Sequence, residues 1–206
     1  MHHRLRIAPF GLLVALSLAA GEAAAQELCA ELTIPPQLDL FCSPAPGSAP
    51  GAVEIAPSGG AFSALSRMTV RPLDREDDAL AWSDPAAWLR RQMTLDTSGF
   101  AGAVSGLADD PDSPFAGERA ESLLESLRNA LAEVGTLPLS ACDDPAVTEP
   151  GRWEMRCNFT AGGLGLLVHQ RLVAEGDRRW GITMRAANEQ RLRHFEAIAN
   201  SFRPTT

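Results

Sequence analysis

The stretch from residue 151 to residue 203 constrains the fold more than any other part of the chain. Three strand-like runs are joined there by short turns that contain glycine. In the first run, residues 152–160, apolar side chains alternate with polar ones, which is the pattern of a strand with one buried face. The other two runs lie at 164–173 and 180–185. Short turns between successive strands predict an antiparallel meander.

A helix is expected to close this unit, from about Asn188 to Phe202. Pro204 stands just beyond it, and proline is common shortly after a helix because it cannot continue one. Apolar residues recur at helical spacing and should form the buried stripe, namely Leu192, Phe195, Ile198, Ala199 and Phe202.

The closing sequence AANEQRLRHFEAIANSFR follows an aromatic strand, and together they resemble the end of PsbP-like and DcrB-like domains. The resemblance implies an α+β fold in which an antiparallel β-sheet is flanked by helices, an α/β/α sandwich. It also implies a non-enzymatic role, since such domains are mostly accessory, assembly or adaptor proteins. The residues that carry it are Gly176, Trp180, Asn188, Glu189, Phe195, Ile198, Ser201 and Phe202.

Upstream, the chain shows further strand and helix signals. Residues 62–71 alternate, with Met68 and Val70 on one face, and predict a strand. Ser83-Asp84-Pro85 indicates a helix start, because a capping side chain precedes a proline in the first turn. That helix should run to about Leu95 and bury three side chains, Trp88, Leu89 and Met93.

Other segments give shorter or weaker signals. Two extended pieces are expected within 32–42, around a Pro-Pro pair, followed by a surface loop at 43–52. A short strand is predicted at 53–55 and a weak one at 100–107. A leucine stripe from Ser113-Pro114 to Val134 predicts another helix that packs into the core.

The N-terminus has the three-part pattern of a secretory signal peptide. A basic start is followed by an apolar run from Ile7 to Ala20, and Ala23-x-Ala25 forms a small-residue cleavage site. We therefore expect a signal peptide at 1–25 and a single domain at 26–206, with no membrane span after cleavage. The 18 basic residues are all arginine, and with the alanine-rich leader this favours a periplasmic or secreted bacterial protein.

All four cysteines lie after the predicted cleavage site. An even number of cysteines in an oxidising compartment favours two disulfide bonds, for which three pairings are possible. We expect the pairing of near neighbours, Cys29 with Cys42 and Cys142 with Cys157. The spacing does not fit thiol exchange or a zinc site, because Cys-x-x-Cys pairs are missing from the sequence.

Composition and motifs exclude several function classes. A net charge of −8 disfavours nucleic-acid binding, which needs clustered positive charge. We predict no metal site and no cofactor. The acidic clusters at 74–78 and 109–112 do not match a calcium loop and are interpreted as solvated loops. Gly102 to Gly106 has its serine misplaced for a nucleophile elbow, and residues 162–165 are interpreted as a hairpin turn rather than a phosphate loop.

One constellation suggests a ligand site. If Trp153, Met155, Val168, Leu172, Ile182 and Met184 face inward, then four other side chains share the opposite face of the sheet. These are Arg156, His169, Arg171 and Arg185. Guanidinium groups match carboxylate and phosphate groups, so this face could bind a small anion. The alternative is that these side chains pair with Glu154 and nearby acids, or are covered by a helix.

The sequence is compatible with three functions. The first is an exported, non-catalytic accessory or adaptor protein that binds another envelope protein. The second is a module that binds a small anionic ligand at the Arg/His face. The third is a hydrolase-type enzyme whose site has no recognisable motif, which a buried histidine or carboxylate with a strongly shifted pKa in a cleft would favour.

Overall fold

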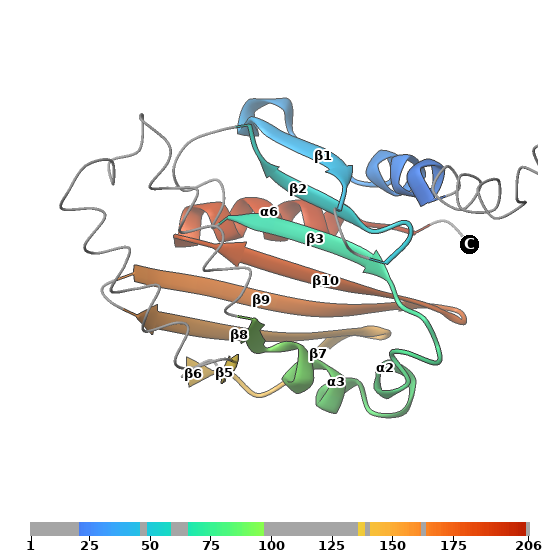
Figure 1. Cartoon of the computed structure of the whole chain (residues 1–206), viewed down its shortest axis with the longest axis vertical. Helices are drawn as coiled ribbons and strands as arrows, with labels where there is room; N and C mark the ends of the chain where they lie inside the picture. The colour runs from blue at the N-terminus through green and yellow to red at the C-terminus, as the bar shows by residue number, and fades with distance from the viewer. Residues whose placement is uncertain are drawn as a thin grey trace, which may run out of the picture.

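One antiparallel sheet organises the protein (Figure 1). The computed structural model describes residues 21–45, 49–58, 66–96, 136–138, 141–161 and 164–204. The strand order is β1-β2-β3-β10-β9-β8-β6, and β7 also pairs with β8. The bounds are β1 (Leu40–Pro44), β2 (Val53–Pro57), β3 (Arg67–Pro72), β6 (Ala141–Cys142), β7 (Ala146–Glu149), β8 (Arg152–Ala161), β9 (Leu164–Glu175) and β10 (Arg178–Ala186). Two further short strands, β4 (Thr94–Asp96) and β5 (Thr136–Pro138), pair with each other.

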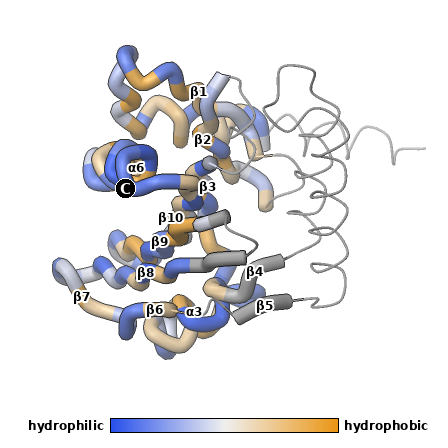
Figure 2. Tube along the Cα trace, turned by 90° about the vertical axis from the view of Figure 1, so that its left-hand side faces the viewer, coloured by the Kyte–Doolittle hydropathy of each residue, from blue (hydrophilic) through white to orange (hydrophobic). Residues whose placement is uncertain are grey.

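Helices lie on both faces of this sheet, so the expected α+β class is confirmed. Helix α6 (Glu189–Ser201) packs on β10 and β9, and Figure 2 shows it to one side of the stacked strands. Helices α2 (Leu80–Ser83) and α3 (Pro85–Gln92) form the other layer, where α3 contacts β8 and β9. Residues 21–30 are also helical, and η1 (Pro36–Leu38) is a short 3-10 helix.

The C-terminal meander is confirmed in its order and direction. Strands β8, β9 and β10 pair antiparallel in sequence order. The β9–β10 turn places Gly176 at a φ of 55°, a left-handed conformation that glycine adopts without a steric penalty. Because this turn has two residues, Arg178 pairs with Glu175, and that pairing sets which side chains of β10 lie beside those of β9.

The core on the α6 side confirms the predicted stripe of the last helix. Phe195, Ile198 and Phe202 have no exposed surface, and they pack with Ile182 and Met184 of β10. The helix starts where expected, because the side chain of Asn188 accepts a hydrogen bond of 2.8 Å from the backbone N–H of Arg191. The first described residues join this core through Ala25, Leu28 and Leu32, so the predicted cleavage site lies within the helical segment 21–30.

The core on the α3 side buries the three predicted side chains Trp88, Leu89 and Met93 against β8 and β9. Asp84 caps this helix by accepting from the N–H of Ala87 at 2.9 Å. The helix ends at Gln92, earlier than predicted from the sequence, because the backbone from Thr94 onward pairs with β5 instead.

Several other segments differ from expectation or fall outside the description. Of the two extended pieces expected within 32–42, the second is present as β1 from Leu40, whereas Pro36 opens the 3-10 turn η1, whose first position suits proline. The strand expected at 62–71 is described from Arg67, with Met68 and Val70 fully buried as predicted. Residues 62–65, the weak strand at 100–107 and the leucine-rich helix at 114–134 lie outside the described residues.

Both predicted disulfide bonds are confirmed, and each fixes one end of the sheet. Cys29–Cys42 ties the helical segment 21–30 to the edge strand β1. Cys142–Cys157 joins directly opposed residues of β6 and β8. Strand β6 has only two residues in register, so few hydrogen bonds would hold it without the covalent link.

Replacing both Cys142 and Cys157 by alanine should lower the free energy of unfolding by about 3 kcal/mol, the chain-entropy value for a loop of this length. We expect β6 to lose hydrogen-exchange protection while β9 and β10 keep theirs. Urea denaturation with exchange mass spectrometry measures both. The matched variant lacks Cys29 and Cys42, and in it residues 21–30 should instead lose hydrogen-exchange protection. An unchanged unfolding midpoint in the first variant would contradict the stabilising role.

Gly181 lies under the ring of Trp88, and this contact predicts which substitutions there would destabilise the protein. A Cβ atom added at Gly181 would stand 2.9 Å from Trp88 Cη2 and 3.2 Å from Leu73 Cδ2. Gly181→Val should therefore destabilise the protein by about 1–3 kcal/mol through overpacking. Gly165→Val is the control, since a Cβ there meets nothing within 4 Å. Equal melting temperatures for the two variants would show that the Trp88 ring is free to shift.

Candidate functional site

The structure brings together three of the four residues predicted to form the Arg/His face. Arg156 of β8 and His169 of β9 are directly paired across the ladder, and Arg171 is two residues further along β9. Arg185 lies on the opposite face, because its partner in β9 is Val168, a member of the α3-side core. The prediction was wrong for Arg185, since the two-residue turn between β9 and β10 places Met184 beside His169 instead.

The assumed apolar face needs the same correction. Trp153, Met155, Val168 and Leu172 do pack together on the α3 side. Ile182 and Met184 pack on the α6 side, the face that also carries His169 and Arg171. The apolar residues of β10 therefore continue the core under α6, whereas β9 places His169 and Arg171 there between its apolar residues Leu167 and Val173.

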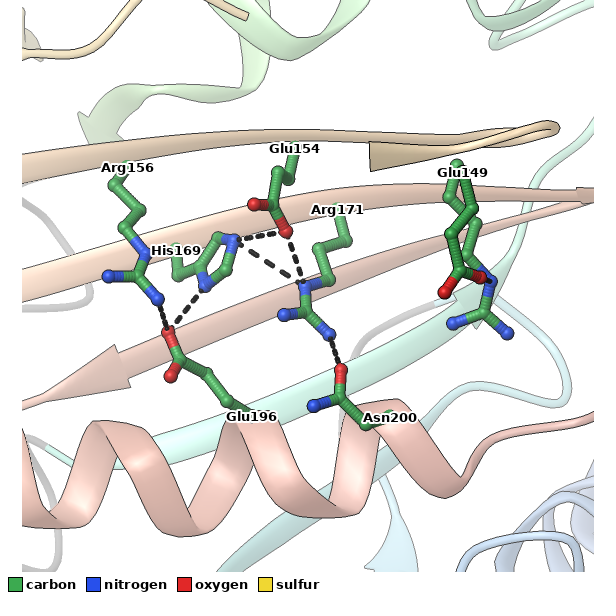
Figure 3. Close-up of polar contacts among 8 residues, drawn as sticks. Glu149, Glu154, Arg156, His169, Arg171, Glu196 and Asn200 are labelled. Atoms are coloured by element: carbon green, nitrogen blue, oxygen red, sulfur yellow. Dashed lines mark hydrogen bonds and ion pairs between the residues drawn. The ribbon is translucent and has the colours of Figure 1, made fainter. Parts of the chain in front are cut away.

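Six side chains from β8, β9 and α6 form what we call the polar network (Figure 3). His169 Nδ1 lies 2.8 Å from Glu196 Oε1, and the same carboxylate is bonded by Arg156. Arg171 Nε lies 3.1 Å from Glu154 Oε2 and 3.4 Å from His169 Nε2. Its Nη1 donates to Asn200 Oδ1 at 2.6 Å. The network consists of Glu154, Arg156, His169, Arg171, Glu196 and Asn200.

Burial and the neighbouring arginines favour a neutral imidazole at His169. His169 is 0% exposed, and burial together with the charges of Arg171 and Arg156 lowers its pKa to about 3. A neutral ring can donate from Nδ1 to Glu196 and accept at Nε2 from Arg171, which matches the two contacts. Glu154 Oε2 lies 3.2 Å from the same Nε2, and Arg171 Nε sits close enough to bond both atoms.

This arrangement favours a structural role over catalysis. The formal charges of two arginines and two glutamates cancel, and Asn200 completes the contacts of Arg171. His169 has no exposed surface to present to a substrate, and a pKa near 3 is far from the value that suits a general base at neutral pH. The alternative weighed from the sequence, pairing with Glu154 under a helix, is what the structure contains.

An open pocket of about 210 Å³ lies beside this network, at the C-terminal end of α6. Arg152 and Arg171 contribute to its lining, but Glu149 and Glu154 do so as well. Arg152 Nε is 3.2 Å from Glu149 Oε2, and its Nη2 donates to the Phe202 carbonyl. Of the predicted anion-binding set, only Arg171 lines the pocket, and the arginine charges there are already matched by carboxylates.

A second polar centre lies on the α3 side and was not expected from the sequence. Asp78 was interpreted as part of a solvated acidic loop, but it is 9% exposed. Both guanidinium Nη atoms of Arg71 donate to it at 2.8 Å, and Trp88 Nε1 donates at 3.2 Å. Burial alone would raise the pKa of Asp78, but the bonds from Arg71 and Trp88 outweigh that and lower it. These bonds fix the segment that leads into α2.

Next to this centre lies a stack of alternating arginine and tryptophan side chains, which we call the Trp–Arg cluster. It consists of Arg75, Trp82, Trp153 and Arg179. Arg179 Cζ is 5.4 Å from the ring centroid of Trp82 and 5.7 Å from that of Trp153. Arg75 Cζ is 6.0 Å from the Trp82 centroid. Both indoles are half-buried, so each packs on the core and keeps one part at the surface.

No sequence signal could have assembled this cluster, since its members come from a loop, α2, β8 and β10. The sequence places Trp153 on an apolar face and Arg75 in a solvated acidic loop, and Trp82 belongs to no predicted pattern. The only local hint is Arg179 at the start of an aromatic strand. Within the described part of the chain, no group of three or more His, Cys, Asp or Glu side chains could hold a metal ion.

Comparison with family models and with curated proteins finds no match for this chain. The resemblance to PsbP-like domains therefore remains an expectation from the sequence, and function must be argued from the sites themselves. None of the helices in the described ranges has the length and apolar character needed to cross a bilayer.

The polar network predicts how stability depends on pH. His169 has a folded-state pKa of about 3, below the ordinary value of 6.5, so the unfolded chain binds a proton that the folded chain excludes. Its stabilising contribution is complete above about pH 6.5 and is lost as the pH falls towards 3. The slope from this one group approaches about 1.4 kcal/mol per pH unit. Asp78, whose pKa is lowered, adds a loss in the same direction at lower pH.

The measurement is urea denaturation between pH 7 and pH 4.5 of the parent and His169→Gln. We expect the parent to lose stability more steeply, because the variant lacks the titrating imidazole. His194→Gln, at a half-buried position on α6, is the matched control for the loss of an imidazole elsewhere in the fold. If His169→Gln keeps the parental slope, His169 is not held neutral.

Proposed function

We propose that the protein is a non-catalytic accessory or adaptor protein that binds another protein of the cell envelope through the Trp–Arg cluster. The observation that carries the proposal is the composition of this surface. Tryptophan and arginine are the residue types most enriched where partner truncation costs the most affinity. Here four of them are stacked on each other, with Trp82 and Trp153 anchored against the α3-side core.

Rigidity supports this choice of surface. Trp82 and Trp153 are partly buried, and Arg179 is held between their rings, so little side-chain freedom remains to be lost on binding. The Asp78 centre holds the neighbouring loop with three hydrogen bonds. A surface ordered in advance in this way favours association over a surface of loose side chains.

The proposal that the protein acts in the cell envelope is based on its two disulfide bonds and its N-terminal leader. Disulfide bonds persist in oxidising compartments, and this chain carries two. The three-part leader at 1–25 adds the expectation of export to a bacterial periplasm or the medium. The expected partner is therefore another exported or membrane-anchored protein.

Binding of a small anionic ligand is the second candidate, and the pocket beside the polar network favours it. Arg171 and Arg152 both line that space. We rank it lower because Glu154 and Glu149 compensate both arginines, so an anion would have to displace a carboxylate. An enzyme with an unrecognised site ranks third, since the buried histidine lacks access to solvent.

The test is crosslinking in the native host with tagged parent, Trp82→Ala and Phe41→Ala, followed by mass spectrometry. We expect the parent to capture one envelope protein and Trp82→Ala to capture at least about tenfold less of it. The reason is that truncating a central aromatic anchor commonly costs about 2 kcal/mol or more of binding free energy. Phe41 is the control, an aromatic residue on β1 that is 55% exposed. Loss with Phe41→Ala alone would place the interface elsewhere.

A further inference from the structure

We propose that the outer edge of strand β1 pairs with the same edge of a second copy of this chain, so that an antiparallel β1–β1 ladder forms a symmetric dimer. Strand β1 is the terminal strand of the sheet, and within the described part of the chain it pairs only with β2 (Figure 1). Three features support the inference: the outward backbone groups of β1, its exposed phenylalanine, and the contrast with β7 at the opposite end of the sheet.

The first feature is the direction of the backbone groups of β1. The N–H of Ala45 donates to the carbonyl of Ala52 at 2.9 Å, which continues the register of the β1–β2 ladder. Bonded and non-bonded pairs alternate in an antiparallel ladder, so Phe41 and Ser43 also bond β2 and the residues between them direct their backbone groups outward. The outward residues are Leu40, Cys42 and Pro44. Proline suits this position, because the ladder with β2 needs no N–H there.

These outward groups are self-complementary. In an antiparallel pairing centred on Cys42, the two Cys42 residues exchange both N–H···O bonds, and the N–H of Leu40 donates to the carbonyl of Pro44 in the second copy. Pro44 has no N–H to offer and is needed there only as an acceptor. All five residues of β1 are then in register, and each outward N–H has an acceptor. The two-fold axis uses both β1 edges, so the assembly closes as a dimer.

The second feature is Phe41, which is 55% exposed. Its side chain lies on the α3-side face of the sheet, because the neighbouring residues Leu40 and Cys42 pack with the α6-side core. Helix α3 packs on β8 and β9, at the other end of the sheet. In the proposed pairing, the Phe41 of each copy lies opposite Ser43 of the other and diagonal to its Phe41, within reach for aromatic contact. Burial of the two rings adds apolar contact to the ladder of hydrogen bonds.

The third feature is the contrast between the two ends of the sheet. Strand β7 also exposes a large apolar residue, Val147, which is 65% exposed. However, β7 carries Glu149, lies between Pro145 and Pro150, and has a shift of register in its pairing with β8. Charges, prolines and bulges are devices that protect sheet edges from pairing with other chains. Strand β1 has no charged residue and one unbroken register, so its edge is the one open to a second copy.

The strength of the dimer follows from the size and order of this edge. The disulfide bond Cys29–Cys42 holds the central residue of β1, so little order remains to be gained on association. A ladder of five residues buries less surface than an obligate dimer interface, so we expect a reversible dimer with a dissociation constant in the micromolar range. The Trp–Arg cluster takes no part in the ladder, since its strand residues lie on β8 and β10. The inference is therefore independent of the proposed function.

The first experiment is analytical ultracentrifugation of the purified full chain, with both disulfide bonds intact, from about 1 µM to about 1 mM. The variants are Phe41→Lys and the matched control Val147→Lys, each of which replaces an exposed apolar side chain on a terminal strand by a cation. We expect Phe41→Lys to raise the dissociation constant about tenfold or more, because it removes the aromatic contact and brings two like charges together. Val147→Lys should leave the constant unchanged. Thermal melting confirms that each variant is folded.

The second experiment tests the ladder itself by amide hydrogen exchange, followed by NMR at low and at high protein concentration. The N–H groups of Leu40 and Cys42 should gain protection as the dimer forms, because they become donors across the two-fold axis. The N–H groups of Phe41 and Ser43 should change little, because they already bond β2.

A chain that stays monomeric up to about 1 mM overturns the inference. A dimer that Val147→Lys weakens and Phe41→Lys does not also overturns it, and so does a dimer without new protection at Leu40 and Cys42, whose copies would meet by their faces. If the chain is monomeric and Phe41→Lys loses a protein captured by crosslinking, the edge binds a strand of another protein and the inference falls. Capture that depends on Trp82 tests the proposed function separately from all of these outcomes.

Discussion

Strand β9 is buried on both faces, and the two faces must be covered by side chains of different chemical character. Toward α3 it presents Val168 and Leu172, which apolar side chains can cover. Toward α6 it presents His169 and Arg171, which apolar cover would leave with an uncompensated charge. Helix α6 resolves this by carrying Glu196 and Asn200, one turn apart, on the flank that meets β9. The placement of α6 and the identity of its polar residues thus follow from one strand.

The C-terminal unit was predictable because its signals are local. Period-two alternation identified β8 and β10, helical spacing identified the buried face of α6, and glycine turns identified the connections. The disulfide pairing was also predictable, since near neighbours in sequence need little chain between them. What alternation cannot supply is the relative phase of two strands. That phase depends on turn length, and the two-residue turn at Gly176-Asp177 places Arg185 on the face opposite to the one predicted.

The two sites differ in how far a sequence can reveal them. Arg156, His169 and Arg171 were found because they lie two residues apart or directly across one ladder. Their internal pairing with Glu196 could not be seen, since it depends on where a later helix crosses the sheet. The Trp–Arg cluster was missed for the same reason: Trp82 of α2 meets Arg179 and Trp153 only where β10 and β8 begin, far from it in the sequence. Long-range juxtaposition of side chains carries no periodic signal.

The disulfide pattern has a consequence for how the chain matures. Each bond joins cysteines that are consecutive in the sequence, and neither loop encloses the other. An oxidant that links cysteines in their sequence order would therefore form the native pairs directly. Non-consecutive pairings need bonds to be broken and rejoined, a slow step that calls for an isomerase. The native pairs of this chain can form without such rearrangement, and both edge regions of the sheet are then covalently fixed.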